Sequence, residues 1–257
     1  MVDLFQFMPE GQVSNSMERK SSIQADFNAV LATLEKLGQP SLKEMLIRNH
    51  GVHEPCWGVK LGDMKPLVRK FKHRQDLAWA LYDTGHYDAM ILAGMIADPM
   101  AFKRQDLTRW LERARGGSLA GHTVPRLVAL GPHAWVLGPR WIELKNARKR
   151  AAGWVVLGML ALSRPDDTLD MQRLCSWMQR VGASIHDECY EVQYAMNGFL
   201  IQVGCGVEFL HQKAKEVAAR VGRLNLDLGN NACQCPEALA YLKRSAQKGV
   251  IGKKRTL

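Results

Sequence analysis

The chain lacks the sequence features of a secreted or membrane-spanning protein. Its first twenty residues mix polar and apolar side chains and contain no apolar core of a signal peptide. Its apolar runs, such as residues 154–162, fall well below the roughly 20 residues that cross a bilayer. We therefore expect an intracellular, cytoplasmic protein without a membrane partner, associated with the nucleoid if the source is bacterial.

Disulfide and metal-ligand patterns are also missing. The six cysteines are scattered, which in a large chain of cytosolic character is typical of reduced thiols. Cys233 and Cys235 have the spacing of half a metal site, but the sequence contains no second pair at ligand spacing. The sequence therefore predicts no metal and no cofactor.

No template of a familiar enzyme class occurs in the sequence. There is no Walker phosphate loop, no Gly-rich dinucleotide fingerprint, no zinc-binding His pair and no nucleophile elbow. His122, His133 and His186 are isolated in the sequence. The remaining acidic candidates have no partner that spacing identifies; they are Glu112, Glu143, Asp187, Glu188 and Glu191. The catalytic residues are therefore unknown, and the sequence leaves open whether the chain is an enzyme.

Apolar residues follow α-helical periodicity along most of the chain. From residue 27 to 37 they recur at the spacing of one buried helical face, and Gly38 ends that helix. Short helices separated by Gly, Pro and Asp turns follow as far as residue 248. Gly138-Pro139 is expected to break the helix at residues 134–144. Because no alternating strand pattern is found, the sequence predicts an all-α fold.

Several of these helices resemble one another. Residues 87–97, 150–160 and 194–203 each combine an apolar run with Ala or Gly near its start, and residues 123–130 are a diverged copy. The steps of roughly 30–45 residues are those of HEAT-like helical repeats, and small residues let stacked helices approach closely. We predict an α-solenoid of helical pairs that forms a single domain over residues 22–248. A flexible segment, residues 1–21, precedes it, and a basic tail, residues 249–257, follows.

Positive charge is in clear excess, with 35 Lys and Arg against 25 Asp and Glu. Such an excess suits a polyanionic partner, either nucleic acid or an anionic surface. The densest cluster is Lys145, Arg148, Lys149 and Arg150, directly before an apolar helix. Cations in the first turn of a helix oppose its macrodipole, and phosphates would account for their presence. A solvated basic face is the alternative.

Two further basic bands and three uncharged side chains are candidates for DNA contact. One band contains Lys60 and Lys65 and extends to Arg74, and the other contains Lys243, Arg244, Lys248, Lys253, Lys254 and Arg255. The uncharged candidates are Trp154, Tyr194 and Asn197. Because a buried Asn must be hydrogen-bonded, a structural bond to a neighbouring turn is the alternative for Asn197.

Short motifs of packing and loop residues are spread over residues 40–255. They are Trp57-Gly-Val-Lys60, Gly62-Asp-Met-Lys65, Leu81-Tyr-Asp-Thr-Gly85, Thr123-Val-Pro125, Arg150-Ala-Ala-Gly-Trp154, Tyr194-Ala-Met-Asn-Gly-Phe199 and Gly252-Lys-Lys-Arg255. With these motifs the chain resembles the DNA alkylation repair family of HEAT-like repeat proteins. The resemblance implies an α-solenoid with a concave, positively charged cleft for duplex DNA. In active members it also implies excision of alkylated purines.

The chain departs from the active glycosylases of that family at their catalytic positions. Those enzymes place a Trp-Trp pair and an Asp just before the Val-Pro step, and by position the Trp becomes Gly117 and the Asp becomes Gly121. A further cleft Trp falls near Gly198 or Phe199, whereas the cleft arginine carries over as Arg150. Without the carboxylate a developing sugar cation has no evident stabiliser, and without the aromatic pair an alkylated base loses cation–π contacts.

These observations predict a monomeric protein that binds duplex or damaged DNA mainly through its phosphate backbone. One alternative is a 3-methyladenine/7-methylguanine glycosylase that uses a different carboxylate. A second alternative is a helical-repeat scaffold whose basic surface binds an acidic protein.

Overall fold

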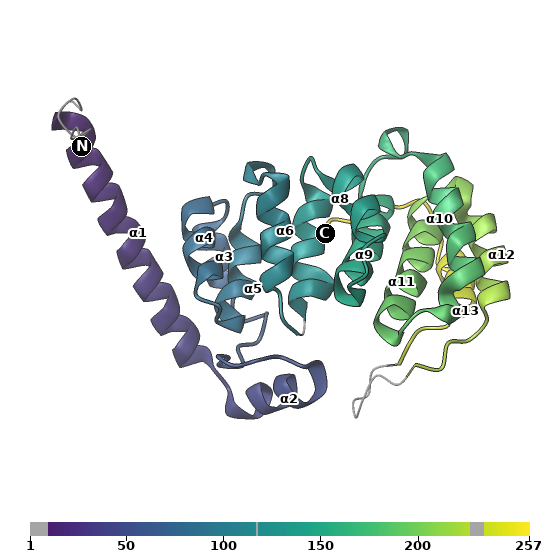
Figure 1. Ribbon diagram of the computed structural model, residues 1–257, viewed down its shortest axis with the longest axis horizontal. Coiled ribbons are helices and arrows are strands. Elements are labelled where there is room, and N and C mark those ends of the chain that lie inside the picture. Colours follow the sequence, from purple (N-terminus) through teal and green to yellow (C-terminus); the bar gives the residue numbers. More distant parts are fainter. Residues whose placement is uncertain (1–9, 117, 227–233) are drawn as a thin grey trace. The chain divides into compact units, whose positions relative to one another are not determined.

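The computed structural model describes residues 10–116, 118–226 and 234–257. These residues form thirteen α-helices, with short π- and 3-10-helical turns and no strand among them (Figure 1). With 72% of the chain in helix, the prediction of an all-α fold is confirmed. The chain divides into two compact units, one of Met1–Ile47 and His53–Asp98 and one of Arg48–Val52 and Pro99–Leu257. That residues 22–248 fold as one domain stays a prediction.

The first unit is built on one long helix and four shorter ones. These are α1 (Glu10–Leu37), α2 (Pro40–His50, which runs into the segment grouped with the second unit), α3 (Lys65–Phe71), α4 (Gln75–Asp83) and α5 (Tyr87–Ile96). Helix α1 begins at Glu10, within the segment for which the sequence shows no apolar periodicity.

The loop between α2 and α3 is held by one buried carboxylate. Asp88, 1% exposed at the start of α5, accepts the main-chain N–H groups of Trp57 at 2.7 Å, Gly58 at 3.2 Å and Val59 at 2.8 Å. Gly58 has a φ of +77°, and a Cβ there would lie 2.5 Å from the main-chain nitrogen of Lys43. The Trp57–Val59 motif is therefore a packing motif that only glycine allows at its centre.

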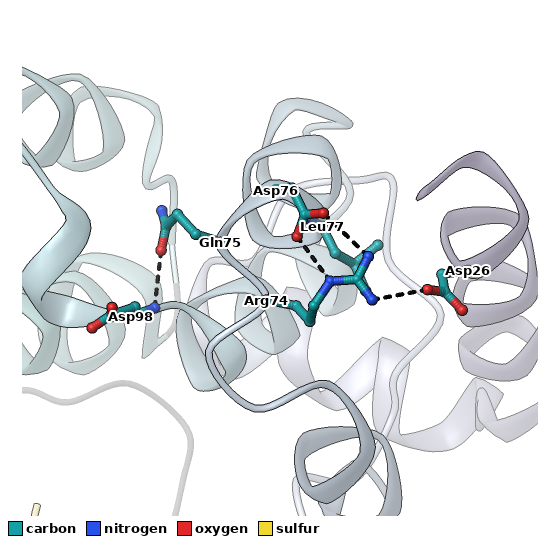
Figure 2. A network of polar contacts seen from close by, with 6 residues as sticks. All are labelled: Asp26, Arg74, Gln75, Asp76, Leu77 and Asp98. Atoms are coloured by element: carbon teal, nitrogen blue, oxygen red, sulfur yellow. Dashed lines mark hydrogen bonds and ion pairs between the residues drawn. The ribbon is translucent and has the colours of Figure 1, made fainter. Parts of the chain in front are cut away.

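A polar network fixes the start of α4 within the first unit (Figure 2). The Arg74 guanidinium donates to Asp26 of α1 at 3.0 Å and to both carboxylate oxygens of Asp76, at 3.0 and 3.2 Å. The side-chain oxygen of Gln75 accepts the main-chain N–H of Asp98 at 2.9 Å. Arg74, the last residue of the first predicted basic band, is thus engaged by two carboxylates.

The second unit consists of two sets of helices. They are α6 (Arg104–Arg113), α7 (Val124–Leu130), α8 (Ala134–Trp141), α9 (Ala147–Ser163), α10 (Met171–Ser184), α11 (Tyr190–Gly206), α12 (His211–Val221) and α13 (Ala238–Gln247). Helices α7, α9, α11 and α13 contact one another in that order and form one layer. Helix α6 packs on α7, α8 packs on α7 and α9, and both α10 and α12 pack on α11 (Figure 1).

Small residues set the close spacing of the helices of the second unit, both within this layer and between it and α8, as the repeated pattern predicts. A Cβ at Gly153 of α9 would lie 2.7 Å from the main-chain nitrogen of Ile142, at the end of α8. A Cβ at Gly206 of α11 would lie 2.5 Å from the carbonyl oxygen of Ala161 in α9. Of the similar segments, residues 150–160 lie in α9, residues 194–203 lie in α11, and residues 123–130 cover α7 and the last residue of the turn before it. These three occupy one recurring position in the layer. Residues 87–97 cover α5 of the first unit.

One expectation about the second unit is wrong. Helix α8 runs through Gly138 and Pro139, where the sequence indicates a break. A Cβ at Gly138 would lie 2.9 Å from Cδ2 of Leu157, so this glycine lets α8 approach α9. Packing against α9 outweighs the poor helix propensity of the Gly-Pro pair.

The described ranges contain neither a membrane-spanning helix nor a metal-binding cluster. None of their helices combines the length and the apolar character needed to cross a membrane. They also contain no group of three or more His, Cys, Asp or Glu side chains placed to hold a metal ion. The five cysteines that the structure describes are free thiols, and Cys233 lies outside the described residues.

Candidate nucleic-acid interface

The basic cluster before the apolar run of α9 occupies the N-terminal end of that helix. We call Lys145, Arg148, Lys149 and Arg150 the α9 basic cluster. The side chain of Asn146 caps the helix by accepting the main-chain N–H of Lys149 at 3.1 Å. Three of the four cations therefore lie in the first turn, which contains no acidic residue. Their charges repel the positive end of the helix dipole.

Arg150 joins the start of α9 to the start of α11. One terminal nitrogen of its guanidinium donates to the carbonyls of Leu144 at 2.9 Å and Lys145 at 3.1 Å. The other donates to the Glu188 carboxylate at 2.7 Å, and both side chains are only 20% exposed. These partly buried bonds, charge-assisted at the carboxylate, link the loop before α9 to the loop before α11. The arginine that the family resemblance places in the cleft thus carries a paired charge.

The other three members of the cluster differ in how strongly the protein engages them. Lys149 forms an ion pair with Glu112 of α6 at 2.9 Å. Arg148 is exposed and donates one bond, of 3.2 Å, to the carbonyl oxygen of Ala114. Lys145 is exposed and has no side-chain bond to any residue that the structure describes. Lys145 and Arg148 are consequently the members best placed to meet an external anion.

Two tyrosines on α11 are exposed. Tyr190 and Tyr194 are separated by four residues, so they lie on the same face, and they are 52% and 45% exposed. Tyr190 follows Glu188, the partner of Arg150, by only two residues. Exposed aromatic rings beside cations are the combination that stacks on nucleobases while the cations bind phosphates.

The structure places the other two uncharged candidates inside the protein. Trp154 is 1% exposed, and its ring lies 5.1 Å from that of Phe199 on α11. Asn197 is 2% exposed and donates to the carbonyl oxygen of Pro236 at 2.8 Å. Trp154 is therefore a core residue, and Asn197 ties α11 to the segment that leads into α13. We leave Trp154 out of the proposed contact surface.

A pocket of about 250 Å³ lies between α11 and α13. Tyr194, Asn197 and Gly198 line it from α11, Tyr241 from α13 and Arg255 from the C-terminal segment. The added Cβ of an alanine at Gly198 would have no atom within 4 Å. Three of the predicted site residues, Tyr194, Asn197 and Arg255, therefore meet at one pocket.

The predicted basic tail has two kinds of lysine. Lys253 is exposed. Lys254 instead donates to the carbonyl oxygens of Ala161 at 3.0 Å and Gly206 at 2.6 Å, and it pairs with Asp166. These carbonyls belong to the last turns of α9 and α11. Lys254 therefore stabilises the C-terminal ends of α9 and α11.

In the first unit, the start and the end of the basic band at residues 60–74 have different surroundings. Lys60 and Lys65 are both exposed, and no residue in the described part of the chain forms an ion pair with either. His73 lies 3.8 Å from Asp98, and Arg74 is bound by Asp26 and Asp76. Lys60 and Lys65, at the start of this band, therefore face solvent. Arg74, at its end, belongs to the polar network that holds α4.

The positions where active glycosylases carry their catalytic residues fall in and beside a π-helical turn, Leu119–Thr123. Gly117 lies outside the described residues, and a Cβ at Gly121 would have no atom within 4 Å. His122 reaches the surface, yet desolvation by the surrounding protein, together with the charge of Arg126, lowers the pKa of its imidazole. The turn therefore offers open space and a neutral imidazole, and its five residues include no carboxylate.

Sequence reasoning missed the partners that decide which cations are available. Spacing in the sequence does not pair Glu112 with Lys149 or Glu188 with Arg150, because 37 and 38 residues separate them. The spacing of Tyr190 and Tyr194 was the one local signal for an exposed aromatic face.

Comparison with known proteins relates this architecture to DNA repair. A family model described as DNA alkylation repair enzyme matches residues 30–217. An uncharacterized protein of Listeria monocytogenes is 26% identical over 228 residues, which cover 86% of this chain and 98% of the relative. A second uncharacterized protein, from Listeria innocua, is 25% identical over 227 residues with the same coverage.

A solved structure is similar over most of its length. It represents a new family of proteins related to the HEAT-like repeat DNA glycosylases with affinity for branched DNA structures. The TM-score is 0.83 at 34% identity, and the match covers 90% of this chain and 98% of that structure.

Proposed function

Because this chain belongs to the DNA alkylation repair enzyme family, we propose that it binds DNA through the α9 basic cluster and the neighbouring tyrosines of α11, without excising bases. The observation that carries the proposal is the pair of exposed cations, Lys145 and Arg148, at a helix end where positive charge is unfavourable for the fold. Phosphates supply the compensating charge.

The relatives support DNA as the class of partner. The solved structure at 34% identity belongs to proteins with affinity for branched DNA structures. Tyr190 and Tyr194 fit such a substrate, since exposed rings can stack on bases that a branch point leaves unpaired. Lys60 and Lys65 of the first unit, and Lys253 and Arg255 of the C-terminal segment, would add contacts to the phosphate backbone.

The absence of excision is proposed from chemistry. Cleavage of a glycosidic bond builds positive charge on the sugar, and preorganised negative charge is usually the largest catalytic contribution. Gly121 has no side chain to supply it, Glu188 is bound to Arg150, and Glu112 is bound to Lys149. Loss of one comparable stabilising group costs about 2.7–4 kcal/mol, or 10²–10³ in rate.

Salt-dependent binding tests the DNA-binding part of the proposal. We expect the affinity for duplex DNA to fall steeply with salt, with each phosphate contact adding about −0.9 to the log–log slope. Lys145→Ala with Arg148→Ala should reduce the magnitude of that slope by about two. The matched control is Lys213→Ala with Lys215→Ala on α12, which removes the same charge and should leave the slope unchanged. No binding at low salt would favour the scaffold for an acidic protein instead.

Base release tests the catalytic part. Methylated duplex DNA is incubated with excess protein, and free 7-methylguanine and 3-methyladenine are quantified in single-turnover conditions. We expect release no faster than in protein-free DNA. Release well above that rate, and abolished by Arg150→Ala, would identify a glycosylase with a different carboxylate and would contradict the proposal.

A further inference from the structure

A second basic surface lies on the other set of helices of the second unit. A pocket of about 520 Å³ is lined by α6 and its preceding residue Lys103, together with Arg140 of α8. Its cations are Lys103, Arg104, Arg109 and Arg140, and its single carboxylate belongs to Glu112. These cations are not adjacent in the sequence, since Arg140 is 31 or more positions from the other three.

The single carboxylate of the pocket does not neutralise it. Glu112 is already paired with Lys149 of the α9 basic cluster at 2.9 Å. Lys103, Arg104 and Arg140 are exposed, and no carboxylate in the described ranges forms an ion pair with any of the three. Three of the pocket's four cations therefore have no carboxylate partner among the described residues.

Two of these cations, Lys103 and Arg104, lie where positive charge does not stabilise a helix. Arg140 lies in the last turn of α8, where a cation favours the helix dipole. Lys103 and Arg104 instead lie at the start of α6, where they oppose it. The side-chain amide of Gln105 also lines the pocket and can donate a hydrogen bond to an oxyanion.

We propose that this pocket binds the phosphodiester backbone of a second DNA arm, diverging from the one held at the α9 basic cluster. Glu112 supplies the link, since it lines the pocket and also pairs with Lys149. The two basic sets are thus neighbours on different helical sets of the same unit. A linear duplex needs only one of them, whereas a branched DNA has phosphates for both. The inference rests on the proposed DNA binding and adds to it the structure of the substrate.

The test compares two DNAs with one variant. Arg104→Gln with Arg140→Gln removes two exposed cations, and its affinity is measured over a salt series for a three-way junction and for a linear duplex of equal length. The slope for the junction should fall in magnitude by about two, because each lost phosphate contact removes about 0.9. The slope for the linear duplex should stay that of the wild type. Arg220→Gln with Arg223→Gln, at the end of α12, is the matched control and should alter neither.

Each outcome has a separate meaning. If the wild-type protein binds neither DNA, the proposed function itself fails. If it binds both, but the variant keeps the wild-type slope for the junction or loses as much on the linear duplex, the second-arm inference fails alone. Inorganic phosphate titrated into the DNA-free protein provides the last comparison. Weak or no binding agrees with a backbone site, and tight binding that Arg140→Gln abolishes would assign the pocket to a small anion.

Discussion

The two ends of α9 both have basic side chains beside them, yet these residues meet the helix in opposite ways. At the C-terminal end Lys254 donates to the carbonyls of Ala161 and Gly206, the last turns of α9 and α11. Its positive charge lies at the negative end of two helix dipoles, where it is stabilising. At the N-terminal end the α9 basic cluster lies where positive charge is unfavourable.

The difference shows that a count of cations does not define a DNA-binding surface. Lys254 and Arg150 belong to the predicted site, but the fold uses both of them, one at helix ends and one in a link to Glu188. Lys145 and Arg148 are the members of the α9 basic cluster that form no ion pair with a described residue. Because no carboxylate of the described residues neutralises these two cations, they are the ones that support an external anionic ligand.

The largest effect is expected at the C-terminal end. Lys254→Met keeps the aliphatic stem but leaves the carbonyls of Ala161 and Gly206 without their donor, and it leaves Asp166 without its partner. We expect the free energy of unfolding to fall by about 2 kcal/mol, because an unsatisfied buried polar group costs about 1–3 kcal/mol. Urea denaturation followed by circular dichroism measures the change. Lys253→Met, at the exposed neighbour, is the control and should alter stability by less than about 0.5 kcal/mol.

A smaller effect is expected from the cap at the N-terminal end. Asn146→Ala removes the side-chain oxygen that accepts the N–H of Lys149, so stability should fall by about 1 kcal/mol. Asn146→Asp keeps the acceptor, adds a favourable charge at the helix start, and should restore stability in the same denaturation experiment. If both variants lose stability equally, the start of α9 is not held by this cap.

Helix periodicity was sufficient for the fold because it reports contacts that are local in sequence. The apolar faces and small residues of α9 and α11 are visible within a single helix. The break at Gly138-Pro139 was misjudged, since the contact of Gly138 with Leu157 depends on a helix that follows later.

The candidate site was less accessible to sequence reasoning, because its properties depend on distant partners. Arg150 meets a carboxylate 38 residues away, and Lys254 meets a carbonyl 93 residues away. Trp154 lies one helical turn after Arg150, and an aromatic side chain beside a cation is typical of a DNA contact. Its ring nevertheless packs against Phe199 in the core. Only the tertiary structure separates such residues from available ones.

The smallest effect is expected when the exposed cations at the N-terminal end are removed. Lys145→Ala with Arg148→Ala relieves repulsion with the helix dipole, so the free protein should gain about 0.3–1 kcal/mol of stability, less what the single bond to Ala114 contributes. The net change should therefore be a few tenths of a kcal/mol in either direction. Thermal unfolding with and without duplex DNA measures it. Added DNA should stabilise the wild type more than the variant, since a ligand at free concentration L that binds only the folded protein raises its stability by RT ln(1 + L/Kd) and the variant has the higher Kd. A loss above about 1 kcal/mol in the free protein would mean that the fold does use these two charges, and the contrast between the ends of α9 would disappear.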